Sequence, residues 1–364
     1  MTTYLLAGGG TAGHVNPLLA VAERIRVRDP EAEVLVLGTV EGLEARLVPE
    51  RGFELLTIDK LPFPRRPNRA ALSFPRRLRD TISQVAEIIE QRGVDVVVGF
   101  GGYVAAPAYL GARKAGVPLV IHEANSRPGI ANRLGSFFTS FVGTAFDRTP
   151  IRGGVVVGMP LRAEIETLDR FAARAEADAF FGLDPKKPTL LVTGGSSGAK
   201  RLNDTVASSV TRILGAGWQV LHITGEYRDV VEDPNLPGYV VVKYCDRMEL
   251  ALASADLAIA RAGTSTVAEL TGLGIPAIYV PYPVGNGEQK YNARTAVDAG
   301  AAVLVMDAQF TSQWVSSELV PMLRKRALIA EMAARASTIG ALDGTERMLE
   351  LVDRALARDL PLTS

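Results

Sequence analysis

In the second half of the chain stands the run Ala258-Ile259-Ala260-Arg261-Ala262-Gly263-Thr264-Ser265-Thr266-Val267-Ala268-Glu269-Leu270. The apolar residues up to Ala260 are typical of a short buried strand, and residues 267–273 have the pattern of a helix that Gly274-Ile275-Pro276 ends. A loop leading into a helix presents the first helical N–H groups outward, at the positive end of the helix dipole. We therefore expect an anion-binding site formed by Gly263, Thr264, Ser265, Thr266 and Val267.

Glu269 follows this loop by about one helical turn, where a carboxylate can accept hydrogen bonds from two neighbouring hydroxyl groups such as those of a ribose. Thr266-Val267-Ala268-Glu269 also matches a capping box, in which the glutamate only reaches back to the first backbone N–H of the helix. Taken alone, this stretch favours neither interpretation, so the rest of the chain has to decide.

The same order of apolar strand, glycine-rich loop and helix occurs at two other places. Tyr4–Ala7 precedes Gly8-Gly9-Gly10-Thr11-Ala12-Gly13-His14, and Thr189–Val192 precedes Gly194-Gly195-Ser196-Ser197-Gly198. Further strands alternate with helical patterns, as parallel sheets covered on both faces require. Because 364 residues exceed what one core usually supports, we predict an α/β chain of two doubly wound, Rossmann-like domains. The expected domains are residues 1–160 and 161–340, with a last helix within 341–364 that packs back on the first.

The composition narrows the class of protein. Hydrophobic residues make up 47% and charged residues 22% of the chain, which is typical of a globular protein, and the formal net charge of +0 does not favour binding to nucleic acid. The single cysteine, Cys245, excludes an internal disulfide and favours a reducing compartment. The three histidines lie far apart and far from Cys245, without the spacing of metal ligands, so we expect neither a metal nor another cofactor.

Three loops of the first domain are expected to share one rim, because ligands of such sheets bind at the carboxyl ends of the strands. They lie at Gly8–Gly13, at Gly99–Tyr103 and at His122–Asn125. The first loop also matches the dinucleotide fingerprint Gly-x-Gly-x-x-Gly, which keeps an NAD-dependent dehydrogenase as an alternative. Against that alternative, no acidic residue closes the second strand, Glu33–Leu37, and Glu41 comes late.

Polar groups in the two domains suit two different substrates. The anion site, Glu269 and the groups at Glu288, Gln289 and Asn292 fit a nucleoside diphosphate sugar. His14, Tyr103 and Asn125 of the first domain fit a second substrate. We therefore expect glycosyl transfer across a cleft between facing loops, with a UDP-sugar epimerase and a non-catalytic sugar-nucleotide sensor as alternatives.

The segment from Leu61 to Asp80 differs from its surroundings, because arginines alternate there with apolar residues and prolines interrupt it. Such a mixture suits contact with an anionic membrane surface, and the alternative is a solvated loop with a few core anchors. The residues expected to dock are Phe63, Arg65, Arg66, Arg69, Leu72, Phe74, Arg76, Arg77 and Arg79.

Short motifs in one order along the chain carry a family resemblance. They are Gly9-Gly10-Thr11-Ala12-Gly13-His14-Val15-x-Pro17, Gly101-Gly102-Tyr103, His122-Glu123-x-Asn125, Gly194-Gly195-Ser196-x-Gly198-Ala199, Arg261-x-Gly263-x-x-Thr266-Val267-x-Glu269 and Gln289-x-x-Asn292-Ala293. Together they cover nearly the whole chain and resemble the MurG family of bacterial peptidoglycan synthesis. The resemblance implies a GT-B fold and transfer of N-acetylglucosamine from UDP-N-acetylglucosamine to undecaprenyl-diphospho-muramoyl-pentapeptide (lipid I), giving lipid II with inversion.

The same resemblance implies roles for individual residues and a place in the cell. The glycine loop and Asn125 would contact the donor sugar, Arg162 and Ser196 the diphosphate, and the Cys245 backbone the uracil. Either Glu288 or Gln289 would face the sugar, since Glu288 stands where the family has the first of two glutamines. The family acts at the inner leaflet, so we expect a peripheral protein on the cytoplasmic side of the membrane, with effects on cell wall formation, shape and division.

Transfer to a hydroxyl needs a base that takes its proton. His14 is the first candidate, by its place in the glycine loop and by the family resemblance, and Glu123 is the second. The alternative for His14 is a structural hydrogen bond that orients the loop.

Overall fold

The computed structural model describes residues 1–61, 69–226, 235–284 and 287–359, with the backbone alone for residues 69–71, 358 and 359. Contacts along the chain divide it into two compact units. The first is Met1–Ala163 together with Asp343–Ser364, and the second is Glu164–Leu342.

The first unit is built on a seven-stranded parallel sheet with the order β3-β2-β1-β4-β5-β6-β7. Nearly all residues of its central strands are buried, because helices cover both faces, and this explains their continuous apolar runs. The strands are β1 (Thr3–Gly8), β2 (Glu33–Gly38), β3 (Glu54–Thr57), β4 (Val96–Gly101), β5 (Leu119–Glu123), β6 (Phe141–Thr144) and β7 (Gly154–Val156).

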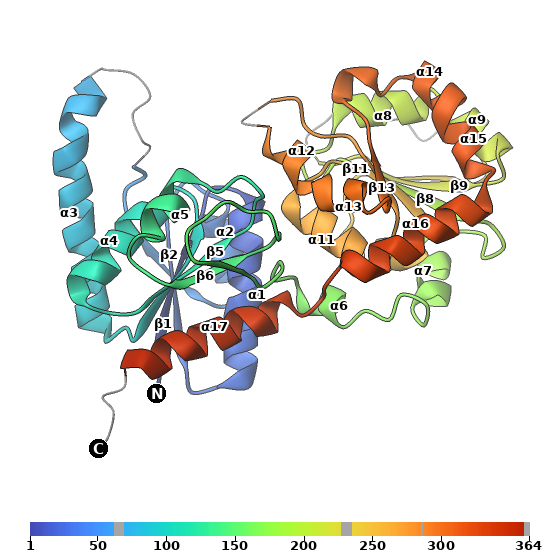
Figure 1. Cartoon of the computed structure of the whole chain (residues 1–364). Coiled ribbons are helices and arrows are strands. Elements are labelled where there is room, and N and C mark those ends of the chain that lie inside the picture. Colours follow the sequence, from blue (N-terminus) through green and yellow to red (C-terminus); the bar gives the residue numbers. More distant parts are fainter. Residues whose placement is uncertain (62–68, 227–234, 285–286, 360–364) are drawn as a thin grey trace. The chain divides into compact units, whose positions relative to one another are not determined.

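Helices lie on both sides of this sheet (Figure 1). One core joins α1, α2 and the C-terminal α17 to one face, with Val15, Leu18 and Met348 fully buried, and a second core joins α3 and α4 to the other. Arg28 pairs with Asp353 at 2.7 Å and thereby links α1 to α17 across 325 residues of sequence. The helices are α1 (Ala12–Arg28), α2 (Glu44–Glu50), α3 (Arg69–Arg92), α4 (Ala105–Ala115), α5 (Ile130–Gly135) and α17 (Gly344–Asp359).

The second unit repeats this plan with a six-stranded parallel sheet, in the order β10-β9-β8-β11-β12-β13. Its strands are β8 (Thr189–Thr193), β9 (Gln219–Ile223), β10 (Tyr239–Val242), β11 (Leu257–Ala260), β12 (Ala277–Tyr279) and β13 (Ala302–Leu304). Two parallel-sheet units in one α/β chain confirm the predicted fold class.

The first helix of the second unit is α6, which begins at Ala163, the last residue of the segment Met1–Ala163 of the first unit. One face of the sheet packs on α8, α9 and the stretch Phe310–Ile329, and α7 packs on α10. The helices are α6 (Ala163–Glu166), α7 (Arg174–Phe181), α8 (Lys200–Ala207), α9 (Val210–Gly215), α10 (Met248–Ser254), α11 (Thr264–Gly272), α12 (Glu288–Asn292), α13 (Arg294–Asp298), α14 (Ser312–Trp314), α15 (Val320–Leu323) and α16 (Arg326–Ile339), with a 3₁₀ turn at Asp307–Gln309 and a π turn at Val315–Leu319.

Of the four prolines expected to interrupt the basic segment, Pro62, Pro64 and Pro67 lie outside the described residues, and Pro75 does not interrupt it. Pro75 lies inside α3, which runs without a break from Arg69 to Arg92. The helix continues past it because its second half is anchored, with Val85, Ala86 and Ile89 buried against the core. Of the residues expected to dock, Phe63, Arg65 and Arg66 lie outside the described residues.

Within the described part of the chain, no helix combines the length and the apolar character that a membrane-spanning segment needs.

Candidate functional site

In the first unit the loops after β1 and β4 are in direct contact. Gly101 and Gly102 have φ values of 96° and 87°, in the left-handed region that favours glycine. A Cβ atom at Gly102 would collide with the Gly9 carbonyl, and one at Gly101 would lie 3.1 Å from Nε2 of His14. The two glycine-rich motifs therefore form one surface at the carboxyl ends of β1 and β4, as the sequence predicted.

His14 lies on this surface in the first turn of α1 and is half-buried. Its Nδ1 is 3.2 Å from the Gly9 carbonyl and 3.2 Å from Oγ1 of Thr11. Because a carbonyl oxygen only accepts, the Gly9 contact requires the hydrogen on Nδ1, which leaves Nε2 with a lone pair. Nε2 is thus the atom of His14 that can take a proton from a substrate.

Burial lowers the pKa of His14 below its ordinary value, while the hydrogen bond to Gly9 and the charge of Glu44 act in the opposite direction. The lowered pKa favours the neutral imidazole near pH 7, which is the form that a general base needs.

Glu123, the other candidate base, ends β5 and is 2% exposed. Its carboxylate accepts hydrogen bonds from the backbone N–H groups of Asn125 and Gly129, both at 2.9 Å, and from Nδ2 of Asn132 at 2.8 Å. Burial raises its pKa, against the effect of these donors. The arrangement favours a role in holding the loop that carries Asn125, and a role as base stays a prediction.

Tyr103 is 46% exposed and lies beside the glycine loop, with the Lys60 ammonium 5.2 Å from its ring centre. A cavity of about 110 Å³ opens here. Its lining includes Gly9, Gly10, Thr11, Thr39, Glu41, Gly42, Glu44, Lys60, Tyr103 and Val104. The glycine loop and Tyr103 were predicted from the sequence, and the structure adds a polar wall from the residues that follow β2 and β3.

In the second unit, α11 begins at Thr264, three residues earlier than the sequence suggested. Gly263 is the N-cap in an extended conformation, and the Val267 N–H donates to its carbonyl at 2.9 Å. Thr266 is therefore inside the helix, so the capping-box interpretation of Thr266 and Glu269 is wrong. The hydroxyls of Thr264, Ser265 and Thr266 lie in the first helical turn, where the outward N–H groups and the dipole favour an anion.

Buried polar contacts hold this helix start in place. Nδ2 of Asn292 donates to the Ala262 carbonyl at 3.4 Å and to Oγ1 of Thr264 at 3.3 Å. The Arg261 guanidinium donates to the Val280 carbonyl at 2.9 Å and pairs with Asp307 at 2.7 Å. Arg261 and Asn292 thus fix the loop around Gly263, and direct contact of either with a substrate stays a prediction.

The remaining predicted residues of the second unit also follow the carboxyl ends of strands. Ser196 is exposed in the loop after β8, and its carbonyl accepts from the Glu226 N–H at 2.9 Å, which joins it to the loop after β9. Cys245 is half-buried after β10, and Glu269 is half-buried on α11. Glu288 and Gln289 are both half-buried in the short helix α12. Oε1 of Gln289 accepts from the Tyr282 N–H at 2.9 Å. In the first unit, Thr11 is exposed, and Ala12, Gly13, Asn125 and Arg162 are half-buried.

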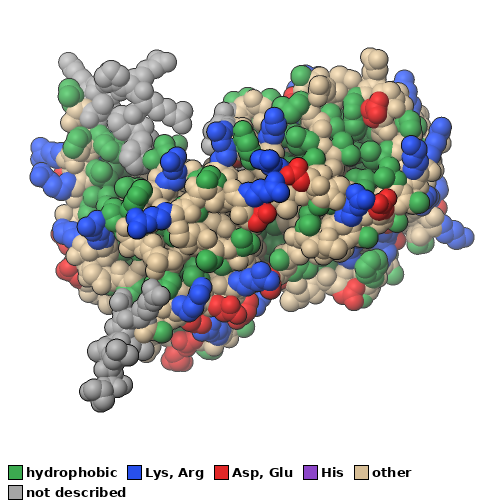
Figure 2. Space-filling model, in the orientation of Figure 1, with side chains coloured by type: hydrophobic (Ala, Val, Ile, Leu, Met, Phe, Trp, Pro, Cys, Tyr) green, Lys and Arg blue, Asp and Glu red, His purple; other side chains and the backbone are tan. Residues whose placement is uncertain are grey.

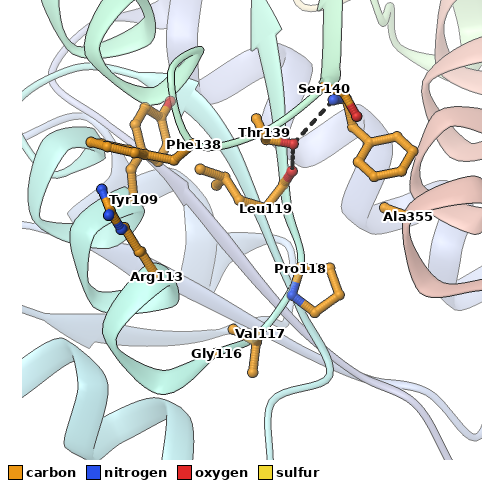
Figure 3. A pocket seen from close by; sticks show the side chains of 11 residues that line it. Tyr109, Arg113, Gly116, Val117, Pro118, Leu119, Phe138, Thr139, Ser140 and Ala355 are labelled. Carbon is orange, nitrogen blue, oxygen red and sulfur yellow. Dashed lines mark hydrogen bonds between the residues drawn. The ribbon is translucent and has the colours of Figure 1, made fainter. Parts of the chain in front are cut away.

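Another cavity, of about 260 Å³, lies in the first unit at the opposite end of the strands (Figure 3). The Arg113 guanidinium stacks on the Phe138 ring at 4.6 Å, and Oγ1 of Thr139 donates to the Leu119 carbonyl at 2.5 Å. Because Leu119 begins β5, this cavity is at the amino ends of the strands, away from the residues described above. We assign no part of the chemistry to it.

Two further polar residues, Glu44 and Asn132, lie beside the glycine loop and Glu123 and were not predicted from the sequence. Glu44 is 1% exposed and Asn132 is 3% exposed, so both are buried at the rim. Asn132 joins three neighbours, because it also donates to the His122 carbonyl at 3.1 Å and accepts from the Tyr109 hydroxyl at 2.6 Å. The sequence signal that could have indicated Glu44 is its place as an acidic residue at the start of the short helix that follows β2.

Comparison with known proteins assigns a class to these two units. Residues 4–144 match the glycosyltransferase family 28 N-terminal domain, and residues 189–348 match the glycosyltransferase family 28 C-terminal domain. With its two parallel sheets and polar loops at their carboxyl ends, the chain is a glycosyltransferase of the GT-B type.

Individual relatives narrow the class to one family. The chain is 60% identical over 357 residues to the UDP-N-acetylglucosamine–N-acetylmuramyl-(pentapeptide) pyrophosphoryl-undecaprenol N-acetylglucosamine transferase of Leifsonia xyli subsp. xyli, covering 98% of this chain and 99% of the relative. The crystal structure of Acinetobacter baumannii MurG has a TM-score of 0.80 at 30% identity and covers 97% of this chain and 100% of its own. The chain belongs to the MurG family of N-acetylglucosamine transferases.

Epimerases share the fold with this chain. The UDP-GlcNAc 2-epimerase from Neisseria meningitidis has a TM-score of 0.66 at 13% identity, covering 97% of this chain and 100% of its own. At that identity the likeness concerns the fold alone, and the epimerase alternative is therefore less supported than the transferase. The dehydrogenase alternative is wrong, because both family 28 domains match.

Proposed function

We propose that the protein transfers N-acetylglucosamine from UDP-N-acetylglucosamine to the 4-hydroxyl of the muramoyl sugar of lipid I, giving lipid II in peptidoglycan synthesis. The observation that carries the proposal is the 60% identity over 98% of the chain to a transferase whose name states this donor and this kind of acceptor. The second unit would bind the donor, and the first would bind the acceptor and the membrane.

The helix start in the second unit supports binding of the donor diphosphate. Thr264, Ser265 and Thr266 present N–H and hydroxyl groups at the positive end of α11, a nine-residue helix. Glu269 would accept from the two ribose hydroxyls, the Cys245 backbone would contact uracil, and Gln289 or Glu288 would contact the sugar. Ser196 and Arg162 would approach the diphosphate.

His14 supports the chemistry on the acceptor side. The acceptor 4-hydroxyl oxygen would form a bond to C1 of the donor sugar, while the bond from C1 to the phosphate oxygen breaks and UDP leaves with the electron pair. The hydroxyl proton would pass to Nε2 of His14, the ring nitrogen opposite the Gly9 contact. Attack from the face opposite UDP inverts the anomeric carbon.

Charge would develop on the departing diphosphate, and two of the groups proposed to bind the donor would oppose it. The N-terminus of α11 and the Arg162 guanidinium would stabilise that charge without a metal ion, because oriented dipoles inside a site need no rearrangement during the reaction. Among the described residues, no group of three or more His, Cys, Asp and Glu side chains is arranged to hold a metal.

The first half of α3 supports docking to an anionic lipid surface. Leu72 is 84% exposed, Arg76, Arg77 and Arg79 are exposed, and Phe74 is half-buried. Figure 2 shows Lys and Arg side chains beside hydrophobic ones at the left edge, where Figure 1 has α3. Cationic side chains around an exposed apolar one suit the headgroup region of the inner leaflet. Peripheral binding there would bring the enzyme to its lipid-borne acceptor, with consequences for cell wall growth, shape and division.

The decisive assay measures UDP release from UDP-N-acetylglucosamine with and without a lipid I analogue. Release that needs the acceptor, together with formation of the disaccharide product, supports the transferase. Conversion of the donor sugar without any acceptor would instead support an epimerase, and no reaction under either condition would support a sensor.

A further inference from the structure

A buried carboxylate in the first unit contacts the glycine loop from behind. Oε2 of Glu44 accepts a hydrogen bond from the Gly10 N–H at 2.8 Å, and Oε1 accepts from the N–H and the hydroxyl of Thr39 at 3.0 and 2.9 Å. Glu44 begins α2 and is 1% exposed. A carboxylate this buried normally has a partner of opposite charge, whereas the three groups that donate to Glu44 here are neutral.

Glycines make the room that this carboxylate occupies. A Cβ atom at Gly9, Gly38 or Gly42 would collide with the side chain of Glu44. The three positions come from different segments, the loop after β1, the end of β2 and the turn before α2. The pocket around Glu44 is therefore a built feature of the fold.

The Gly10 N–H that Glu44 accepts from and the Gly9 carbonyl that faces His14 belong to one planar peptide group. The hydrogen bond to a carboxylate at the N–H end of a peptide group polarises it and makes its carbonyl oxygen a stronger acceptor. That oxygen is 3.2 Å from Nδ1 of His14. Glu44 thus acts on the imidazole through one intervening peptide group.

We propose that Glu44 is a positioning residue of the transfer reaction, which orients the Gly9–Gly10 peptide so that its carbonyl holds the hydrogen on Nδ1 of His14 and leaves Nε2 as the proton acceptor. The inference rests on the proposed function of His14. During the reaction the acceptor proton moves to Nε2, the Nδ1 hydrogen stays between His14 and Gly9, and no proton reaches Glu44. The polarised carbonyl stabilises the imidazolium that forms, in the way that a directly bonded carboxylate does for other histidine bases.

The charge on Glu44 also faces His14 and raises the pKa of that ring, against the larger effect of burial. Glu44→Gln removes this charge and keeps the size of the side chain and an oxygen that can accept from Gly10. We expect kcat to fall by ~10-fold or more, near the lower end of a general base's contribution, with an unchanged KM for the donor. The acid limb of the pH profile should move to lower pH, because the pKa of His14 falls.

Asp95→Asn is the matched control. Asp95 also accepts a backbone N–H, that of Thr3 at 2.8 Å, but at the amino end of β1. This variant should change neither kcat nor the acid limb. Wild-type kinetics in Glu44→Gln, with the same acid limb as Asp95→Asn, would overturn the proposal.

A measurement on the unmodified protein keeps the proposal testable if Glu44→Gln does not fold. ¹⁵N spectra of the imidazole rings, with the His14 signals assigned through a His14→Gln variant, report which nitrogen carries the hydrogen. We expect the hydrogen on Nδ1, and a hydrogen on Nε2 would overturn the proposal. This measurement needs no turnover, so it tests the proposed position of the hydrogen on His14 independently of the reaction. The proposed reaction is tested separately by UDP release with the wild-type protein.

Discussion

The side-chain amide of Asn292 donates to the hydroxyl oxygen of Thr264 at 3.3 Å, and both residues are buried. Since Asn292 ends α12 and Thr264 begins α11, one amide fixes the helix start proposed to bind the donor phosphates. We infer that the precision of that anion site depends on a residue 28 positions away in sequence.

Asn292→Ala should therefore weaken donor binding, although Asn292 is 28 positions away from Thr264 in the sequence. Two buried hydrogen bonds are lost, which costs roughly 1–3 kcal/mol of stability, and we expect the KM for UDP-N-acetylglucosamine to rise by about 10-fold. Gln219→Ala is the control, because its buried amide donates to Asp184, Lys187 and Thr189 at the amino end of β9. The control should lose stability in thermal unfolding without a change in donor KM, and equal KM values in the two variants would contradict the role of Asn292.

His14→Ala should keep donor binding and lose turnover by ~10²-fold or more, because the proposed general base is removed. In the wild-type enzyme, kcat should fall only at a pH below the ordinary pKa of histidine, since burial lowers the pKa of His14 and the neutral ring is the form proposed to act as the base. Steady-state kinetics from pH 5 to pH 8 would measure the loss of turnover in His14→Ala and the pH dependence of kcat in the wild type.

Glu123→Gln distinguishes the two candidate bases. The amide has one acceptor oxygen for three N–H donors, so thermal stability should fall, while the acid limb set by His14 should remain. Loss of the acid limb in Glu123→Gln but not in His14→Ala would make Glu123 the base instead.

Glu269→Ala should raise the KM for UDP-N-acetylglucosamine by roughly 10–100-fold, because a carboxylate hydrogen-bonded to hydroxyls contributes about 1.5–3 kcal/mol. The role of Glu269 in binding ribose is tested by a donor with 2′-deoxyribose. The wild-type enzyme should discriminate against this donor, and Glu269→Ala should not. Discrimination that survives the substitution would mean that another group contacts the 2′-hydroxyl.

Local patterns were sufficient to predict the strands and the glycine loops, because each apolar run and the turn after it lie within a few residues of one another. The start of α11 was misplaced because Thr264, Ser265 and Thr266 have the composition of a loop, whereas the extended Gly263 and the distant Asn292 make them helical. Glu44 was missed for the same reason. Its partner Gly10 is 34 residues away, and only the folded chain brings its carboxylate to the glycine loop.

Replacing Arg76, Arg77 and Arg79 together with glutamate should release the protein from vesicles that contain anionic lipid. Each arginine near such a surface contributes about 1 kcal/mol, so removal of three cations weakens binding by ~100-fold or more, and the added negative charges oppose it further. The control replaces Arg324, Lys325 and Arg326, three exposed cations of the second unit, with glutamate and makes the same change in net charge. In a vesicle sedimentation assay at low and at high salt, the control should bind as the wild type does, and binding of both should decrease with salt. Equal binding of the two triple variants would mean that net charge, rather than the α3 surface, determines the attachment.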